Sequence, residues 1–293
     1  MTSTGAAPPA PLPAPLVTRA VSAALEEDLG ITGDVTTNAT IPLGARSSAV
    51  LVARKPGVIA GLAVAEQAFK VLDPDIQFTA LVADGDEVGS GTVVARISGP
   101  SRSILSGERV ALNFMGRMSG IATLTRRYVD AVEGTSAKIV DTRKTTPGLR
   151  AFEKYAVRCG GGHNHRIGLY DAVLIKDNHI VAAGGIGPAI AAAHWNAGHM
   201  VKIEVEVDTL EQLRAALDHP IDAVLLDNMS PGELRKAVSL AGGRVVTEAS
   251  GGVNLETVRQ IAEAGVDLIS VGALTHSAPV LDLGLDFDTP VER

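Results

Sequence analysis

Seven lysines and arginines lie in the segment 139–180 against four acidic residues, so this segment carries a formal charge of +3. The whole chain of 293 residues carries −7, so the remainder sums to −10. Three of the seven histidines lie in the segment too, namely His163, His165 and His179. A local group of cations in an acidic protein predicts a site for an anionic ligand.

A solvated, basic helix face is the alternative interpretation of these cations. It fits Arg150, Lys154 and Arg158, which are spaced four apart, like side chains on one side of a helix. It does not fit the other cations, which fall at predicted strand ends and in glycine-rich loops: Arg143, Lys144, Arg166 and Lys176.

Two carboxylates, Glu206 and Asp227, come at the ends of two consecutive predicted strands. Oxygen ligands at neighbouring strand ends are suited to holding Mg²⁺, partly through water. They could also act as an acid–base pair, or form structural ion pairs with Lys176 and Lys202. Because charged groups inside a barrel are more often functional, we predict a functional role for both.

Glycine-rich turns follow the last two predicted strands, at Ser250-Gly251-Gly252 and at Gly272-Ala273. Glycine lets backbone N–H groups approach a phosphate closely, and a helix expected to begin near Asn254 would add its N-terminal dipole. Each turn alone is typical of ordinary loops. On adjacent late strands, the two together predict a phosphate site.

Other reactive side chains are open to more than one interpretation. Lys176 at a strand end is suited to a Schiff-base nucleophile or to a fixed cation for a carboxylate. The spacing of His163 and His165 suggests zinc, but no third ligand follows at metal-site spacing, so we do not expect a zinc site. Cys159, the only cysteine, is typical of inert packing at a helix end.

Alternating strand and helix patterns after residue 137 must position these residues. The predicted strands cover 137–141, 171–176, 201–207, 221–226, 244–249 and 266–271, with helices over 208–217, 231–240 and 254–264 between them. Such regular alternation predicts parallel strands with right-handed crossovers. In a barrel of this kind the functional side chains gather at the carboxyl ends of the strands.

The strand 201–207 helps to choose between an open doubly wound sheet and a barrel. Its charged side chains all fall on one face, and its valines and isoleucine on the other. A barrel strand with a polar interior explains this pattern, and an edge strand with one solvated face is the alternative. Six strands fall short of eight, so the predicted fold class is α/β with an incomplete TIM-like barrel.

The first part of the chain shows an α+β pattern. We predict helices over 16–29 and 61–72, a turn-forming loop over 33–37, and strands over 47–54, 76–82 and 88–97. The last two strands would form a hairpin across 84–86. A long helical stretch over 101–131 is expected to break or kink near Gly116 and Gly120. The predicted domains are a disordered tail (1–13), a first domain (14–118, joined by 277–293) and a barrel domain (119–276).

Composition excludes several classes of protein. Hydrophobic residues make up 46% of the chain and aromatic residues only 3%, so the core must be aliphatic. No apolar run has the length of a membrane span. The N-terminus is rich in proline and alanine and lacks the basic n-region of a secretory signal, so we do not expect it to be one. The negative net charge argues against nucleic-acid binding. One cysteine cannot form an intrachain disulfide, which suits a reducing cytoplasm. We therefore expect a cytoplasmic protein that binds neither membrane nor nucleic acid.

Motifs in order along the chain resemble the quinolinate phosphoribosyltransferase family, also called nicotinate-nucleotide pyrophosphorylase (carboxylating). They are TRKTTPGLR (142–150), GHNHR (162–166), LIKDNH (174–179), EVEV (204–207), LDN (226–228), SGG (250–252) and GALTH (272–276). EDLG (27–30), GDVTT (33–37) and GERVALN (107–113) match as well, so the resemblance covers about residues 16 to 286. The departures are minor, namely the N-terminal tail and Ala249, where a second serine is common.

This resemblance implies an N-terminal α/β sandwich domain beside an incomplete α/β barrel. It implies a homodimer with a shared active site and leaves a higher oligomer open. The implied reaction joins quinolinate to phosphoribosyl pyrophosphate with Mg²⁺, and it gives nicotinate mononucleotide, pyrophosphate and CO₂ in de novo NAD biosynthesis.

Site roles carry over by motif from the same resemblance. Quinolinate would be surrounded by Arg143, His165, Arg166, Lys176 and, from the second subunit, Arg109. Phosphoribosyl pyrophosphate and Mg²⁺ would be held by Lys144, Glu206 and Asp227, with Thr142 also binding substrate. The 5′-phosphate would be bound by backbone donors of Ser250, Gly251, Gly252, Gly272, Ala273 and Leu274, with His276 nearby. The catalytic candidates are Lys144, Lys176, Glu206 and Asp227.

Three other functions stay open. One is a paralogous phosphoribosyltransferase that acts on another aromatic acid, such as nicotinate, or that is linked to molybdenum transport. Another is a Schiff-base aldolase that uses Lys176. The third is a carrier module, because 82–97 resembles a biotinyl or lipoyl hairpin, but this segment lacks the lysine to which such a cofactor is attached.

Overall fold

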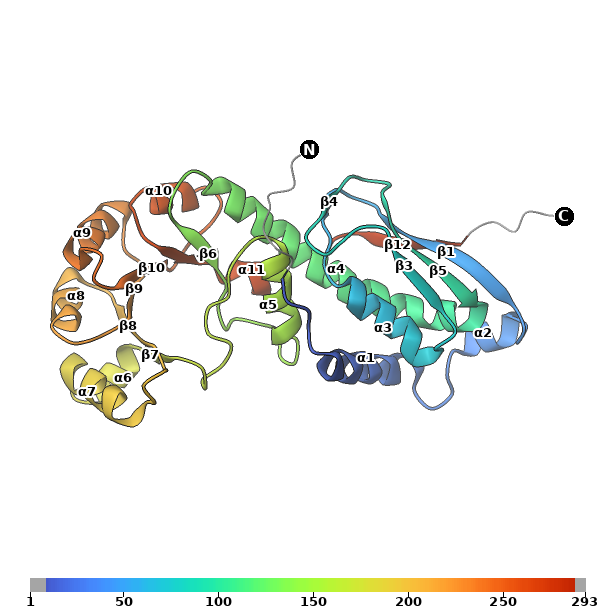
Figure 1. Ribbon diagram of the computed structural model, residues 1–293, viewed down its shortest axis with the longest axis horizontal. Coiled ribbons are helices and arrows are strands. Elements are labelled where there is room, and N and C mark those ends of the chain that lie inside the picture. Colours follow the sequence, from blue (N-terminus) through green and yellow to red (C-terminus); the bar gives the residue numbers. More distant parts are fainter. Residues whose placement is uncertain (1–8, 288–293) are drawn as a thin grey trace. The chain divides into compact units, whose positions relative to one another are not determined.

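The structure, a computed structural model, describes residues 9–287, so most of the tail predicted at 1–13 lies outside the described residues (Figure 1). The chain forms two compact units. The first contains the residues up to Leu124, Ala151–Gly161 and the segment from Ala278 onward; the second contains Thr125–Arg150 and Gly162–Ser277. The limits given above for the functional domains, which place 151–161 with the barrel, stay a prediction. No helix of the described chain is long and apolar enough to cross a membrane.

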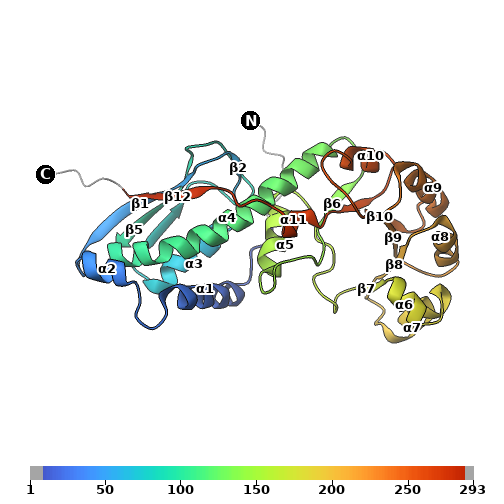
Figure 2. The same cartoon turned by 180° about the vertical axis from the view of Figure 1, so that it is seen from behind.

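An antiparallel sheet of four strands, in the order β12-β1-β5-β3, forms the first unit. Its strands are β1 (Arg46–Ala53), β3 (Gln77–Ala80), β5 (Val93–Pro100) and β12 (Leu283–Phe287). Figure 2 shows β12, near the carboxyl end, beside β1, and their pairing ties the end of the described chain to this unit. Helices α1 (Ala14–Leu29) and α3 (Leu62–Leu72) pack together, and Phe69 of α3 stacks on Phe78 of β3.

Two local predictions for this unit were wrong. Residues 33–37 are not a plain loop, because the Asp34 carboxylate accepts a hydrogen bond from the Thr37 N–H (2.9 Å) and caps helix α2 (Val35–Thr40). The two strands predicted on either side of 84–86 do pair antiparallel, but no tight turn across 84–86 joins them. Strand β3 pairs with β5, whereas β4 (Glu87–Val88) between them pairs with β2 (Gly57–Val58).

Helix α4 (Ser101–Ala131) runs without the break that was predicted at its glycines. A Cβ at Gly120 would overlap the carbonyl oxygen of Pro279, and a Cβ at Gly116 would lie 2.8 Å from Val280 Cγ1. The Leu281 N–H also donates a hydrogen bond to the Gly116 carbonyl (3.0 Å). These glycines therefore allow the segment 279–281 to pack closely on α4.

Helix α5 (Arg150–Cys159) corrects the interpretation as a solvated basic face. Lys154 is only 2% exposed, and the buried Glu153 forms an ion pair with Arg117 (2.7 Å). Burial raises the pKa of the Cys159 thiol to about 12, which agrees with inert packing.

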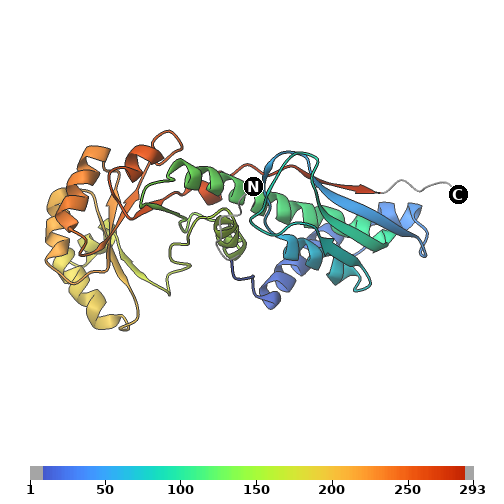
Figure 3. The same ribbon diagram turned by 45° about the horizontal axis from the view of Figure 1, so that its top comes forward.

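The second unit contains a sheet with helices beside it (Figure 3). Its six strands are parallel and lie in the order β6-β11-β10-β9-β8-β7. They are β6 (Lys138–Val140), β7 (Val173–Ile175), β8 (Ile203–Val207), β9 (Ala223–Asp227), β10 (Val246–Ser250) and β11 (Leu268–Ser270). All six were predicted from the sequence. Within residues 9–287, β6 and β7 are not paired with each other, so the barrel is incomplete, as predicted.

Helices follow the strands of this sheet and include α6 (Asp177–Ala182), α7 (Ile186–Asn196), α8 (Leu210–Leu217), α9 (Pro231–Ala241), α10 (Val258–Ala262) and α11 (Ala273–His276). In β8, the apolar residues Ile203, Val205 and Val207 are at most 3% exposed. They alternate with Glu204 and Glu206, which therefore lie on the opposite face. The charged face predicted for this strand is confirmed.

Candidate active site

Most of the predicted site residues gather at the carboxyl ends of the six strands. The strands are parallel, so these ends share one edge of the sheet; Ser250, for example, pairs with Asp227 of the neighbouring strand. Arg109 is not among them, since it is an exposed residue of α4 in the first unit. Those at this edge follow or end β6 (Thr142, Arg143, Lys144), β7 (Lys176), β8 (Glu206), β9 (Asp227), β10 (Ser250, Gly251, Gly252) and β11 (Gly272, Ala273, Leu274, His276).

A tight contact between two turns holds Asp227 at the ends of β9 and β10. Asn228 has φ = 53°, the one positive φ of a non-glycine residue in the described chain. Its N–H donates to the Ser250 carbonyl (2.9 Å), and its Nδ2 donates to Asp227 Oδ2 (2.6 Å). Gly251, at φ = 91°, lies so close that a Cβ there would be 2.6 Å from Asn228 Cγ. Backbone strain of this kind is concentrated at functional sites.

The turn at Ser250–Gly252 does not open directly into a helix. Helix α10 begins only at Val258 and has five residues. Asn254 instead closes a turn, because its side-chain oxygen accepts hydrogen bonds from the N–H groups of Glu256 (2.9 Å) and Thr257 (3.0 Å). The predicted helix dipole at this turn was therefore wrong, and only its backbone N–H groups are suited to bind a phosphate.

Lys144 is anchored to the turn that follows β11. The buried Thr275 donates a hydrogen bond from Oγ1 to the Lys144 carbonyl (2.7 Å). A Cβ at Gly272 would lie 3.1 Å from Lys144 Cδ and 3.2 Å from His276 Nε2. The structure therefore brings Lys144, Gly272 and His276 together.

Lys176 forms an ion pair with Glu206 across the neighbouring strands β7 and β8. The Lys176 side chain is 45% exposed, so the pair is open to solvent on the lysine side. The alternative interpretation of Glu206 and Asp227 paired them with Lys176 and Lys202 in structural ion pairs. Lys202 forms its ion pair with Asp222 instead.

Arg166 lies near a second guanidinium and two carboxylates. Burial lowers the pKa of Arg166, the nearby Arg143 lowers it further, and Glu204 and Asp171 act in the opposite direction. Two arginines close enough to repel each other favour an anion between or beside them. Arg166 is also fixed by a hydrogen bond from its Nη1 to the Ala172 carbonyl (3.1 Å).

A buried acidic group beside Arg166 was missed by the sequence analysis. His165 Nε2 lies 3.0 Å from Glu204 Oε2 and 3.5 Å from Glu248 Oε2. Asp141, fully buried, accepts hydrogen bonds from the His165 N–H (2.9 Å) and from Asn164 Nδ2 (2.6 Å). The alternation in β8 and β10 was the available signal, since Glu204 shares a face with Glu206, and Glu248 with Ser250.

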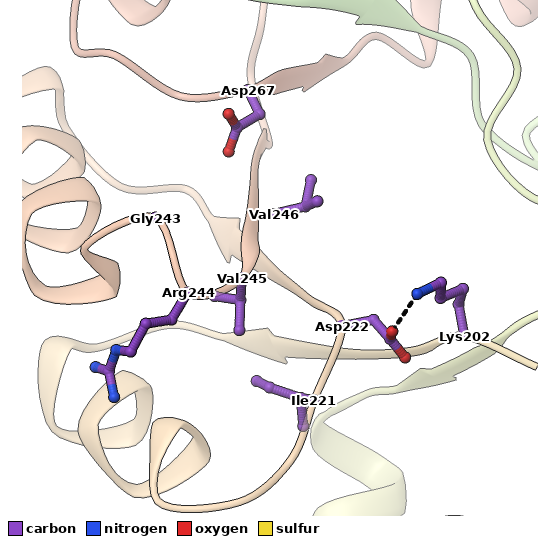
Figure 4. A pocket seen from close by; sticks show the side chains of 8 residues that line it. All are labelled: Lys202, Ile221, Asp222, Gly243, Arg244, Val245, Val246 and Asp267. Carbon is purple, nitrogen blue, oxygen red and sulfur yellow. Dashed lines mark hydrogen bonds and ion pairs between the residues drawn. The ribbon is translucent and has the colours of Figure 1, made fainter.

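A hollow of about 370 Å³ lies at the opposite, amino-terminal edge of the sheet (Figure 4). Its polar groups are already satisfied by the fold. Lys202 and Asp222 form the ion pair drawn in Figure 4, and Asp267 Oδ2 accepts a hydrogen bond from the Thr247 N–H (2.8 Å). This hollow therefore has the features of a structural edge and not of the reaction site.

A parallel sheet with cations, carboxylates and glycine turns at its carboxyl edge defines an α/β enzyme acting on anionic substrates. Residues 34–119 match the N-terminal domain of quinolinate phosphoribosyl transferase, and residues 121–286 match its C-terminal domain. The chain belongs to the quinolinate phosphoribosyl transferase family.

Relatives with the same names cover most of the chain. A probable nicotinate-nucleotide pyrophosphorylase (carboxylating) of Bacillus subtilis (strain 168) is 48% identical over 261 residues, which is 89% of each chain. A mitochondrial quinolinate phosphoribosyltransferase (decarboxylating) 2b of Nicotiana tabacum is 47% identical over 91% of this chain and 80% of its own. The solved nicotinate-nucleotide pyrophosphorylase of Francisella tularensis superposes with a TM-score of 0.90 at 41% identity, covering 95% of this chain and 98% of its own.

Proposed function

We propose that this chain transfers the phosphoribosyl group of phosphoribosyl pyrophosphate to quinolinate, with loss of CO₂. The products are nicotinate mononucleotide and pyrophosphate, and the reaction belongs to de novo NAD biosynthesis. The observation that carries the proposal is the carboxyl edge of the second unit's sheet, where cations for a dicarboxylate and glycine turns for a phosphate meet.

Quinolinate is a dianion at neutral pH, so its site needs several fixed cations. Arg143 and Arg166, which lie near each other, and Lys176 supply three of them. Arginine binds carboxylates in a bidentate geometry that fixes the ring as well as its charge. These residues would orient the pyridine nitrogen toward the ribose.

The phosphates of the second substrate would meet the turns after β10 and β11. Gly251 and Gly272 carry no side chain of their own beside their backbone N–H groups, and Lys144 lies beside Gly272. Backbone donors and a lysine suit a phosphate group, because they match both its oxygens and its charge.

Glu206 and Asp227 fit a magnesium ion by the chemistry of their donors. Both offer carboxylate oxygens from neighbouring strands, and Asp227 is oriented by Asn228 Nδ2. When bound, Mg²⁺ would neutralise charge on the departing pyrophosphate. The same carboxylates would stabilise positive charge that builds at ribose C1 as the C1–oxygen bond breaks.

Bond formation between the pyridine nitrogen and ribose C1 makes the ring cationic. The bond from the ring to the adjacent carboxylate then breaks, CO₂ leaves, and the electron pair stays on the ring carbon until a proton adds there. The ring nitrogen is the electron sink, so positioning and electrostatics suffice and no protein nucleophile is needed. This fits a site that holds cations and carboxylates.

A homodimer with shared sites and a cytoplasmic location complete the proposal. Arg109 lies on α4 of the first unit, whereas the strand ends belong to the second unit, so in the proposed homodimer the other subunit would supply this arginine to the reaction site. The names of the plant relatives include a mitochondrial enzyme and chloroplastic ones, so location varies among relatives.

The direct test is an assay with carboxyl-labelled quinolinate, phosphoribosyl pyrophosphate and Mg²⁺. We expect labelled CO₂, pyrophosphate and nicotinate mononucleotide in equal amounts, and no turnover in excess EDTA. Mononucleotide without CO₂, or full activity in EDTA, would contradict the proposal. A Schiff-base aldolase would instead be trapped at Lys176 by borohydride with a carbonyl substrate.

A further inference from the structure

His165, Glu204 and Glu248 form a buried group, here called the buried triad, beside the cations of the site. Their side chains are 14%, 10% and 1% exposed, and they come from the segment after α5, from β8 and from β10. Neither Glu204 nor Glu248 has a role in the steps of the proposed reaction.

The hydrogen bonds of His165 fix the state of its ring. The Arg166 N–H donates to Nδ1 (2.7 Å), so Nδ1 carries a lone pair and no hydrogen. The hydrogen of the neutral ring is then on Nε2, which donates to Glu204 Oε2 (3.0 Å). Both ring nitrogens are thus engaged by the protein.

A metal ion is the obvious alternative occupant, because the three ligand atoms lie within 4.8 Å of one another. Such an ion would need the lone pair of Nε2. With Nδ1 also accepting a hydrogen bond, the ring would have to lose its last hydrogen and become an anion, which is unfavourable. The geometry of His165 therefore argues against a metal site.

Glu248 has the surroundings of a carboxyl group that keeps its proton. Its Oε1 is buried with no hydrogen-bond partner, and Oε2 lies 3.5 Å from His165 Nε2, too far for a good hydrogen bond. Burial, the charge of Glu204 and, less strongly, Asp141 raise the pKa of Glu248, His165 and the Ser270 hydroxyl act in the opposite direction, and the resulting pKa is about 7. A protonated Glu248 avoids a second buried, unpaired charge.

We propose that Glu204 and Glu248 are positioning residues for the anion site. Glu204 accepts the Nε2–H of His165 and so holds the neutral ring that fixes the backbone of Arg166, while Glu248 lies beside this ring without adding a charge. Glu248 is the member that carries a proton, so the pair of glutamates bears one negative charge. Asp141 supports the same segment from the end of β6 through the His165 N–H. This inference rests on the proposed function, because the bound anion is quinolinate.

Loss of the Glu248 proton adds a negative charge beside the site of a dianion. The titratable and charged groups that face Glu248 are Glu204 of β8, His165 of the segment after α5, and Asp141 after β6. None of them offsets the new charge while His165 stays neutral. Quinolinate binding should therefore weaken as the pH rises through neutrality.

The test compares kcat and KM for quinolinate from pH 6 to pH 9 at saturating phosphoribosyl pyrophosphate. In the wild type, KM should rise on the order of tenfold over this range, the effect of one extra buried charge beside the anion site. Glu248→Gln, a neutral isostere, should lack this rise, while Glu204→Gln should raise KM at every pH. Glu256→Gln, at an exposed glutamate of the same unit, should keep the wild-type profile. An unchanged rise in Glu248→Gln, or superimposable profiles for the two buried variants, would overturn the inference.

A second measurement does not depend on activity. In protein with ¹⁵N-labelled histidine, the His165 signals, assigned by their loss in His165→Asn, should show hydrogen on Nε2 alone throughout this pH range. A doubly protonated ring, or stoichiometric zinc uptake from Zn²⁺ alone that Glu248→Gln abolishes, would refute the inference. If the wild type did not use quinolinate, the proposed function would be refuted instead. The histidine signals would then still test the protonation state of the buried triad, because they do not depend on activity.

Discussion

Gly251 shows at the scale of one residue how the fold shapes the proposed phosphate site. Its φ of 91° disfavours any side chain, and a Cβ would collide with the Asn228 side chain that orients Asp227. Gly251→Ala should raise KM for phosphoribosyl pyrophosphate more than about tenfold, because strain and overlap here cost on the order of 1–3 kcal/mol.

Gly243→Ala is the matched control for this substitution. Gly243 also has a positive φ (72°), but nothing lies within 4 Å of the added Cβ, and the residue is at the amino-terminal edge of the sheet. Its kinetic constants should stay those of the wild type. Equal effects of the two substitutions on KM would show that the contact with Asn228 has no functional role.

Glu248 also predicts how stability depends on pH. Its pKa is raised to about 7 in the folded chain, from a model-compound value of 4.5. The stabilising contribution of its proton is full below the unfolded value, and it is lost as the pH rises through the folded value. Glu248→Gln should therefore gain stability relative to the wild type between pH 5 and pH 8.5, measured by urea unfolding. A stability difference that does not change with pH would contradict the assignment of the proton.

Single residues also show how much of the candidate site could be predicted from the sequence. The spacing of polar residues at strand ends placed Lys144, Lys176, Glu206 and Asp227 at one edge, and the parallel sheet does bring the ends of their strands together. The buried triad was not predicted from the sequence, because its members become neighbours only when the chain folds and brings β8 and β10 against the segment after α5. No spacing along the chain reports such a contact. The roles of the site residues themselves stay predictions.

Helix α4 illustrates the same limit at the scale of an element. Its glycines predicted a break in the helix, whereas the helix is continuous. The glycines instead leave room for the segment 279–281 to pack closely against the helix. Gly120→Ala should destabilise the chain by about 3 kcal/mol or more, because the added methyl group meets backbone atoms that cannot rotate away. Arg127→Ala, at an exposed position of the same helix, should change stability by less than about 0.5 kcal/mol. Comparable unfolding midpoints for both variants would contradict the packing role of Gly120.

Elements with a strong period were predictable, and short ones were not. The six strands of the second unit repeat with helices between them, and β8 alternates charge with aliphatic residues, so hydrophobic patterning was sufficient. Helix α2 and strands β2 and β4 have six, two and two residues, too few for a period to emerge. They are specified by a capping carboxylate and by pairing between distant segments. The start of α10 was missed because Asn254 closes a turn before the helix begins.

At the scale of the whole molecule, the role proposed for Arg109 depends on two subunits coming together. It lies in the first unit, while the strand-end residues lie in the second, and the proposed homodimer lets each subunit lend its arginine to the other. Removing a guanidinium that pairs with a desolvated carboxylate should cost on the order of 2–5 kcal/mol in binding. Arg109→Ala and Lys176→Ala should therefore each be nearly inactive alone.

Mixing these two variants tests the sharing of sites. A mixed dimer would contain one site with both defects and one site with neither, so a fraction of wild-type activity should return once subunits exchange. Mixing Arg109→Ala with wild-type chains labelled by mass would show by mass spectrometry that exchange has taken place. Exchange without recovered activity would mean that Arg109 acts within its own chain or has no role in the reaction.

The central claim is that a cluster of cations at the carboxyl edge of the sheet selects an aromatic dianion for phosphoribosyl transfer. The most direct measurement is the ratio of kcat/KM for quinolinate to kcat/KM for nicotinate, under the same concentrations of phosphoribosyl pyrophosphate and Mg²⁺. Nicotinate lacks one carboxylate and would leave one of the site's cations without its anionic partner, so the ratio should exceed about 10². Equal values of kcat/KM for the two acids would contradict the claim.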